Sequence, residues 1–397
     1  MSHHMNAILI TNVDSLLGYA LAYRFLEEWN RRSSVNEEFR EKTEFRLLCR
    51  ERQGMEELER MGAKVMEIPN YNDPDILKAA LRGVSYMMLL PENDSMAYMA
   101  GKMMMEQAKK EKVDYVALFS YQGIDHVEKH KHHYSSLYPF YQLEQELRSV
   151  FGKDNCCIFR SGMWHQFFYY FGPMISDKNK VQLPIRKDCR WTSIDLGDLV
   201  DAVYNLSVGE KGSEQRRQAG NHANLAQSIV ANLRKKNQLL FCFTGEETIS
   251  PHQLTRSMEK SLQLGHPLKF EEIDAATLQK YLKEIHNDNR FRARPGMSDK
   301  EFLQLFVDEA EQQQRSSQVG ASISDSESRS SHQSHYTFPL GRYLNDNVIY
   351  GLLEFWRLAD AGHTEETTSD LQKALGRHPR HLEDFFEHNR DQFRRLR

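Results

Sequence analysis

Short apolar runs alternate with stretches of helical periodicity through the first 160 residues, and this alternation constrains the fold more than any other feature of the chain. The runs are each about one strand long, and they span 7–11, 45–49, 64–68, 84–90, 115–120 and 156–159. A continuous apolar run is typical of a strand buried on both faces, and strand–helix alternation at this spacing favours parallel pairing. We therefore predict an α/β fold with a doubly wound parallel sheet.

The turn after the first run reads Thr11-Asn-Val-Asp-Ser-Leu-Leu-Gly18, which parallels a glycine-rich loop that binds the pyrophosphate of a dinucleotide. In the pattern TGxxGxxG the glycine positions correspond to Asn12, Ser15 and Gly18, so only the third glycine is present. Asn accepts a left-handed backbone better than other non-glycine residues, and a serine hydroxyl can donate to a phosphate. Asp14 opposes phosphate binding unless its carboxylate points outward. These eight residues are equally compatible with a strand–helix turn that binds nothing.

Arg50 follows the second predicted strand, where NAD-binding proteins of this kind carry an acidic residue for the ribose hydroxyls. An arginine there suits the 2′-phosphate of NADP through paired charge-assisted hydrogen bonds. Glu51 weakens this interpretation and Arg52 supports it. The alternative is a solvated charged turn.

The chain resembles the NmrA-like branch of the atypical short-chain dehydrogenases, which includes isoflavone-reductase-like proteins. The likeness lies in ILITNVDSLLG (8–18), LLCRE (47–51), GAKVMEIPNYNDPDILKAALRGVSYMMLLP (62–91), VDYVALFSYQGID (113–125) and CIFRSGMW (157–164). The third stretch is the most specific. A C-terminal stretch, LQKALGRHPRHLEDFFEHN (371–389), resembles the closing helix pair of the family.

The resemblance implies a Rossmann fold that binds NAD(P), with a smaller α/β C-terminal domain over the cleft. NADP(H) is favoured over NAD(H), and loss of the nucleotide is a further alternative. The implied cofactor-binding residues are Thr11, Asn12, Ser15, Leu16, Leu17, Gly18, Arg50, Asn70, Leu90, Pro91, Ser120, Gln142 and Gly162. Regulatory members of the family sense the dinucleotide redox state and bind partners such as transcription factors.

We predict four parts in the chain of 397 residues, which is long enough for two domains. The NAD(P)-binding domain spans 1–160, and a smaller substrate or partner domain spans 161–311. The segment 312–335 is rich in Ser, Gln and His, and we predict a disordered insert there. The closing helices, within 336–397, carry enough aromatic residues to require burial against the main body.

The catalytic positions of the superfamily are only partly present. Working members use a Ser after the fifth strand and a Tyr-x-x-x-Lys pair, in which the Lys lowers the pKa of the phenol. Ser120 and Tyr138 are the candidates here, but Gln142 stands where the Lys belongs. A glutamine can hydrogen-bond a ribose but cannot lower the pKa of a phenol by its charge. No catalytic assignment follows from this set.

Three other patterns admit both structural and functional interpretations. The aromatic segment 164–171 suits either a helix packed between domains or a substrate wall. The histidine-rich segment 128–134 suits a solvated loop, and less readily a proton relay or a metal site; we predict no metal. The methionines between 96 and 105 fall at helical spacing and indicate core packing.

Composition limits which partners and which cellular compartment we expect for the chain. A net charge of −4 argues against direct nucleic-acid binding, and no apolar stretch approaches membrane-spanning length. Five cysteines without CxxC spacing and the polar N-terminus predict a reducing compartment, the cytoplasm or the nucleus. Three functions remain open: a non-catalytic NAD(P)-binding redox sensor acting through a protein partner, an NADPH-dependent reductase of a small aromatic or quinone-like substrate, and a protein-binding pseudo-domain without nucleotide.

Overall fold

The computed structural model describes residues 6–33, 43–69, 71, 73–209, 225–288, 291, 341 and 343–396. Asn70 and the predicted insert 312–335 lie outside these residues. The main sheet has seven parallel strands in the order β10-β6-β5-β4-β1-β2-β3. Its strands are β1 (Asn6–Ile10), β2 (Thr43–Cys49), β3 (Lys64–Glu67), β4 (Val84–Leu89), β5 (Tyr115–Tyr121), β6 (Cys156–Ser161) and β10 (Leu240–Phe243). The predicted doubly wound parallel sheet is confirmed.

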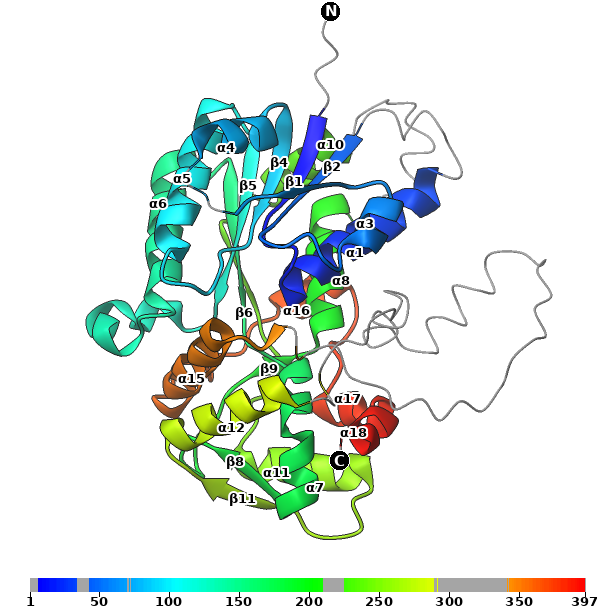
Figure 1. Cartoon of the computed structure of the whole chain (residues 1–397), viewed down its shortest axis with the longest axis vertical. Helices are drawn as coiled ribbons and strands as arrows, with labels where there is room; N and C mark the ends of the chain where they lie inside the picture. Colours follow the sequence, from blue (N-terminus) through cyan, green and yellow to red (C-terminus); the bar gives the residue numbers. More distant parts are fainter. Residues whose placement is uncertain are drawn as a thin grey trace, which may run out of the picture.

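Helices cover both faces of this sheet (Figure 1). One face carries α4 (Pro74–Leu81), α5 (Ala97–Lys110) and α6 (Tyr138–Phe151), and the other carries α1 (Leu16–Ser33), α8 (Leu196–Val208) and α10 (Leu225–Lys236). Burial on both faces explains why the strands are continuous apolar runs. The strand order reverses between β1 and β4, and in open parallel sheets the crevice at the carboxyl ends of such strands is where ligands bind.

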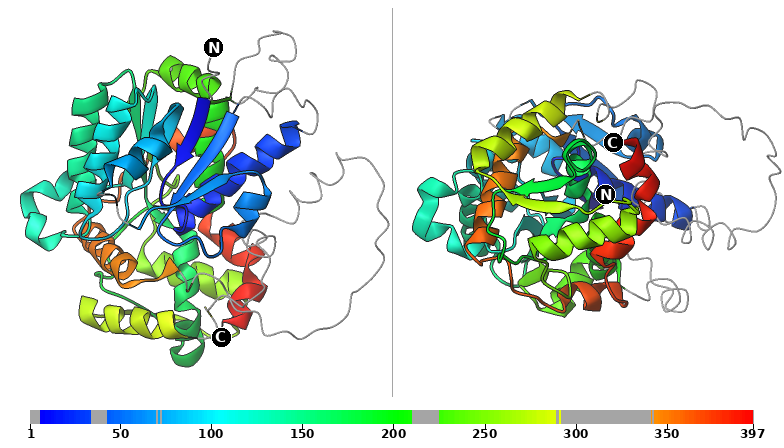
Figure 2. Two further views of the ribbon diagram at one scale, coloured as in Figure 1. Left: turned by 45° about the horizontal axis from the view of Figure 1, so that its top comes forward. Right: turned by 90° about the horizontal axis from the view of Figure 1, so that it is seen from below.

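A smaller α/β part lies beyond these carboxyl ends (Figures 1 and 2). It contains two short sheets, β7 (Met163–Trp164) with β9 (Ser193–Ile194) and β8 (Lys180–Leu183) with β11 (Lys269–Glu272). Its helical segments are η3 (His165–Phe171), α7 (Gly172–Lys178), α11 (Pro251–Leu262), α12 (Ala275–Asn287), α15 (Asp346–Asp360), α17 (Leu382–His388) and α18 (Arg390–Arg395). A short α3 (Glu56–Arg60) follows β2, and α16 (Asp370–Leu375) packs on α8.

Three sequence-based expectations were wrong in detail. The sequence favours a strand over 181–190, but β8 ends at Leu183, directly before a proline. The sequence also favours helix over 367–386, but this segment forms two helices, because Gly376 adopts a left-handed backbone (φ 70°) that ends α16. Two of the methionines expected in the core, Met96 and Met99, are 45% and 48% exposed.

A buried ion cluster, formed by Asp195, Asp198, Arg377 and Arg380, joins the chain after α16 to the start of α8. Asp198 is fully buried and lies 2.6 Å from the Arg377 Nη2 atom and 2.6 Å from the backbone N–H of Arg380. Asp195 accepts a hydrogen bond from the Arg380 guanidinium at 3.2 Å and another from Gln166. This cluster fixes the closing helices against the body of the protein.

No helix in the described part of the chain is long and apolar enough to cross a membrane.

Candidate functional site

A cleft of about 940 Å³ lies at the carboxyl ends of the central strands, between the loops after β1, β2 and β4 and the helix α15. Its two ends differ in chemistry. We call the first the acidic end, lined by Asn12, Asp14, Ser15, Arg50, Glu51, Gln53, Gly54, Glu56, Glu92, Asn93 and Asp94. We call the second the aromatic end, lined by Leu16, Leu17, Tyr19, Leu90, Pro91, Phe119, Ser120, Tyr121, Phe140, Ser161, Gly162, Met163, Trp164, Phe167, Tyr343, Asn345, Asn347, Val348, Gly351, Leu352 and Phe355.

The loop between β1 and α1 has the backbone of a dinucleotide-binding turn. Asn12 adopts the predicted left-handed conformation, with φ of 53°. A Cβ atom on Gly18 would lie 2.1 Å from the Asn12 carbonyl oxygen, so close packing requires the third glycine. The Thr11 hydroxyl accepts from the Leu90 N–H at 2.9 Å, which ties the end of β1 to the end of β4.

Ser15 uses its hydroxyl within the loop. The Oγ atom donates to the Asn12 carbonyl at 2.6 Å and accepts from the Gly18 N–H at 3.1 Å. A helix N-terminus binds phosphate through its free N–H groups. The Gly18 N–H, one of the donors that a pyrophosphate would use, is therefore already bonded to the Ser15 hydroxyl.

Asp14 bridges the loops after β1 and β2. Its Oδ2 atom accepts from the backbone N–H groups of Arg50 (2.8 Å) and Glu51 (3.2 Å). The Oδ1 atom is buried and has no hydrogen-bond partner among the described residues. In this fold the adenosine ribose of a dinucleotide lies near the end of the second strand, with the pyrophosphate at the helix N-terminus. The Asp14 carboxylate is bonded to the backbone that follows β2, the strand end beside which that ribose would lie.

The Arg50 guanidinium is held by carboxylates. Its Nε atom lies 2.8 and 2.9 Å from the two carboxylate oxygens of Glu92, and Asp94 lies 3.8 Å from another nitrogen. Arg50 also donates to the Pro69 carbonyl and lies over the ring of Tyr71, 4.9 Å from its centroid. Hydrogen bonding to Glu92 raises the pKa of Arg50, and burial raises the pKa of Glu92. The cation predicted to bind a 2′-phosphate is thus neutralised within the protein.

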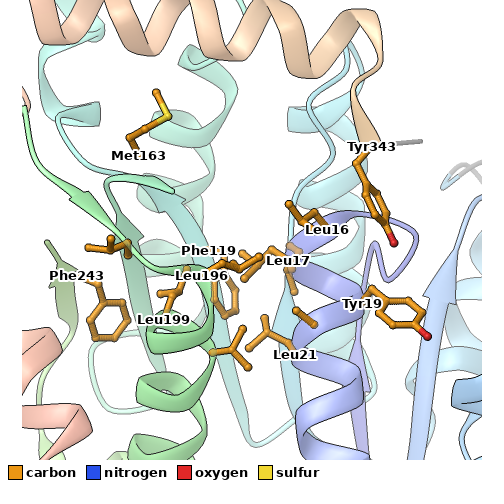
Figure 3. Close-up of a cluster of buried hydrophobic side chains, with 14 of the residues drawn as sticks. Leu16, Leu17, Tyr19, Leu21, Phe119, Met163, Leu196, Leu199, Phe243 and Tyr343 are labelled. Atoms are coloured by element: carbon orange, nitrogen blue, oxygen red, sulfur yellow. The ribbon is translucent and has the colours of Figure 1, made fainter. Parts of the chain in front are cut away.

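Aromatic side chains from distant segments meet at the other end of the cleft. Trp164 and Phe167 stack with 5.2 Å between ring centroids, and Tyr121 contacts Phe140 edge to face at 4.8 Å. Tyr343 lies beside Leu16 and Tyr19 at the start of α1 (Figure 3). The helix α15 adds Val348, Leu352 and Phe355 to this wall.

The candidate catalytic residues are not brought together in the cleft. Ser120 lines it, is 6% exposed, and its hydroxyl has no hydrogen-bond partner among the described residues. Tyr138 and Gln142 are not among the described residues that line it. The face of α6 that packs inward carries Phe140, Leu143, Glu144, Leu147 and Phe151, and Glu144 is held by Arg160. Tyr138 instead stacks with Tyr141, with 6.0 Å between ring centroids.

Tyr121, which sequence reasoning missed, is one of three tyrosines among the described residues that line the cleft, with Tyr19 and Tyr343. The Tyr121 hydroxyl donates to Asn93 at 3.0 Å, and burial raises the pKa of Tyr121 to about 12. Glu92 was also missed, although an acidic residue directly after the Leu-Pro that ends β4 was a usable signal.

The aromatic segment 164–171 divides between the cleft and the core, and its role as a substrate wall stays a prediction. Trp164 and Phe167 face the cleft, whereas Phe168 and Tyr169 are buried against the closing helices. In the segment 128–133 the three histidines are exposed. Among the described residues no group of His, Cys, Asp or Glu could hold a metal ion.

No protein-family model matches the sequence, and a search of curated proteins found no match. Solved structures match over nearly the whole chain. Triphenylmethane reductase of Citrobacter sp., complexed with NADP(H), has a TM-score of 0.59 at 12% identity, covering 96% of this chain and 98% of that one. The NADPH-dependent quinone oxidoreductase of Escherichia coli, complexed with NADPH, has a TM-score of 0.57 at 14% identity (95% and 97%). NmrA, a negative transcriptional regulator, in complex with NADP, has a TM-score of 0.54 at 12% identity (97% and 95%).

The chain has the fold of the NmrA-like proteins. These structural neighbours include NADPH-dependent reductases and a transcriptional regulator, and they bind NADP(H).

The described residues of this cleft do not fit NADP(H). They supply five carboxylate side chains and one cation, Arg50, which Glu92 already holds. A 2′-phosphate alone carries about −1.5 to −2 charges, and a pyrophosphate adds more. Bringing these groups beside Asp14 and Glu92 would place like charges together in a half-buried site.

Proposed function

We propose that this chain is a non-catalytic regulator that acts by binding a protein partner and that has lost NADP(H) as a cofactor. The observation that supports it most is the charge of the cleft. Arg50, the one cation among its described lining residues, is paired with Glu92, and the Asp14 carboxylate is bonded to the backbone N–H groups of Arg50 and Glu51 after β2.

The absence of a catalytic set supports the same function. Hydride transfer in this superfamily needs a phenol whose pKa a nearby lysine lowers. Gln142 stands at the lysine position, and Lys side chains are missing from the described lining of the cleft. The pKa of Tyr121 is raised, so its phenol is a poor source of a phenolate near neutral pH.

Trp164 provides a direct test, because it lines the cleft and its emission would transfer energy to bound NADPH. We expect no change in tryptophan emission with NADPH up to about 1 mM, which corresponds to binding weaker than about −4 kcal/mol. We also expect no NADPH oxidation with a panel of quinones. Tight NADPH binding or steady turnover would overturn the proposal. A matched titration with the Trp164→Phe variant identifies the contribution of the other tryptophans.

A dinucleotide sensor is the second candidate, favoured by the loop backbone. Asn12 and Gly18 keep the conformation and packing of a dinucleotide turn. Binding of NADPH without turnover in the same experiment would select this function.

A reductase of a small aromatic substrate is the third candidate, favoured by the aromatic end of the cleft. Trp164, Phe167 and Phe355 could hold a planar substrate beside Ser120. In that case Tyr121→Phe should abolish turnover, and Tyr138→Phe should leave it unchanged.

A further inference from the structure

More carboxylates than cations line the cleft among the described residues. Asp14, Glu51, Glu56, Glu92 and Asp94 line the acidic end, and Arg50 alone opposes them among the described residues. The Arg50 Nε–H is shared between the two carboxylate oxygens of Glu92, and another Arg50 nitrogen lies farther from Asp94, at 3.8 Å. The remaining negative charge faces the cleft, where a positive ligand would be attracted.

Two buried polar atoms in the cleft lack partners among the described residues. The Asp14 Oδ1 atom is at the acidic end, and the Ser120 Oγ atom is at the aromatic end. Ser120 is 6% exposed, so its hydroxyl has little access to bulk water. Buried polar groups are nearly always hydrogen-bonded in folded proteins. Asp14 Oδ1 can only accept and therefore needs a hydrogen-bond donor, whereas the Ser120 hydroxyl can pair with either a donor or an acceptor on a ligand.

The aromatic end suits the same kind of ligand. Trp164 and Phe167 are nearly parallel, with 8° between their planes, and offer a flat surface for stacking. Aromatic faces also attract cations, most strongly where water is excluded. A volume of about 940 Å³ is within the usual range for small-molecule sites.

We propose that this cleft binds an aromatic organic cation. Its ring lies at the aromatic end, beside Trp164 and Phe167, and its positively charged nitrogen groups face Asp14, Glu51 and Asp94. A nitrogen-bound hydrogen would supply the donor that the Asp14 Oδ1 atom lacks. The proposal rests on the loss of NADP(H) proposed above, because a dinucleotide would occupy the same cleft.

Probes of matched size and opposite charge test this directly. Ethidium is an aromatic cation, and anilinonaphthalenesulfonate is an aromatic anion; the fluorescence of both rises in an apolar site. Spermidine is a cation without a ring. We expect the full chain to bind ethidium at one site, at least roughly tenfold more tightly than either of the others, with affinity that falls as salt rises.

A charge-removing variant links binding to the acidic end. Glu51→Gln combined with Asp94→Asn should weaken ethidium binding roughly tenfold, because two nearby charges are lost. Asparagine keeps the cap that Asp94 gives to the Met96 N–H, so folding is preserved. Glu383→Gln is the matched control, because it removes a carboxylate on α17 that pairs with Lys260 outside the cleft. The control should change the affinity by less than roughly twofold.

Three results would overturn the proposal. They are equal or tighter binding of the anionic dye, an ethidium affinity that is the same in the double variant, and equal losses in the double variant and the control. If ethidium fails to bind and NADPH also fails, the cation site is wrong while the non-catalytic function stands. If NADPH binds tightly and displaces ethidium, both proposals are wrong.

Discussion

Two groups of charged side chains, the buried ion cluster and the acidic end of the cleft, are built from the same residue types but are completed differently. In the buried cluster, Asp195 and Asp198 meet Arg377 and Arg380, and both carboxylates are hydrogen-bonded. At the acidic end the described lining residues include five carboxylates and one arginine, which pairs with Glu92 and lies near Asp94, and an oxygen of Asp14 has no partner among the described residues. Charges that hold a fold together are balanced within it. An excess of one sign at a cleft indicates a surface for a ligand.

The largest effect should come from breaking the buried cluster. Arg377→Ala leaves the fully buried Asp198 without its guanidinium partner, and we expect a loss of about 3 kcal/mol in the free energy of unfolding. Urea denaturation measures this. Arg394→Ala, which breaks an exposed pair with Asp391, should cost less than about 0.5 kcal/mol. Equal losses in the two variants would mean that the burial of Asp198 does not strengthen its dependence on Arg377.

A buried histidine next to this cluster should make stability depend on pH. Burial lowers the pKa of His165 to about 3, whereas the unfolded chain takes up this proton near its ordinary pKa of 6.5. The unfolded state therefore binds more protons between these values, and stability falls as the pH drops below about 6.5. The slope is about 1.4 kcal/mol per pH unit for one proton.

His165→Gln removes this titration. Between about pH 6.5 and pH 5, the wild-type chain should lose about 2 kcal/mol more than the variant in urea denaturation. Identical pH dependence in the two proteins would show that His165 takes up its proton at the same pH in the folded and unfolded states.

Freeing Arg50 should partly restore a phosphate site. Glu92→Gln keeps a hydrogen-bond acceptor beside Arg50 but removes the charge, so NADP should bind roughly tenfold more tightly, a gain of about 1.4 kcal/mol. Calorimetry of both proteins measures the change. Glu56→Gln removes a carboxylate from the same end of the cleft and is the control. A gain of the same size in both variants would mean that net charge, and not the release of Arg50, controls binding.

The smallest effect should come from Tyr121→Phe. The variant loses one hydrogen bond to Asn93, which should cost about 1 kcal/mol in thermal or urea unfolding. Ethidium affinity should stay within roughly twofold, because the ring that contacts Phe140 is kept. A large loss of affinity would place the Tyr121 hydroxyl in contact with the ligand.

The local sequence was enough to predict the strands and turns, because these depend on interactions between residues close together in the chain. The strands follow from continuous apolar runs, and the left-handed turn at Asn12 follows from its position in the loop. The sequence also favours a helix over 137–150, which agrees with α6 to within a residue or two. The direction in which its side chains point was not predicted, because it depends on contacts with a neighbouring strand such as the buried Glu144–Arg160 pair.

Contacts between distant segments decided the rest of the site. Arg50 and Glu92 are 42 residues apart, and no spacing rule connects them. The helix α15 reaches the cleft from the far end of the chain, so Val348 and Phe355 could not be assigned to it. The placement of Arg50 at the end of β2 was correct, but its partner in the folded protein is a carboxylate.

Calorimetric titration of the purified full chain with NADP, NADPH, NAD and NADH tests the central claim most directly. The excess of carboxylates over Arg50 predicts no measurable heat with the phosphorylated pair up to about 1 mM, and at most weak binding of NAD and NADH. Micromolar binding of NADP or NADPH would contradict it, because Arg50 would then have to leave Glu92 for the 2′-phosphate at little cost.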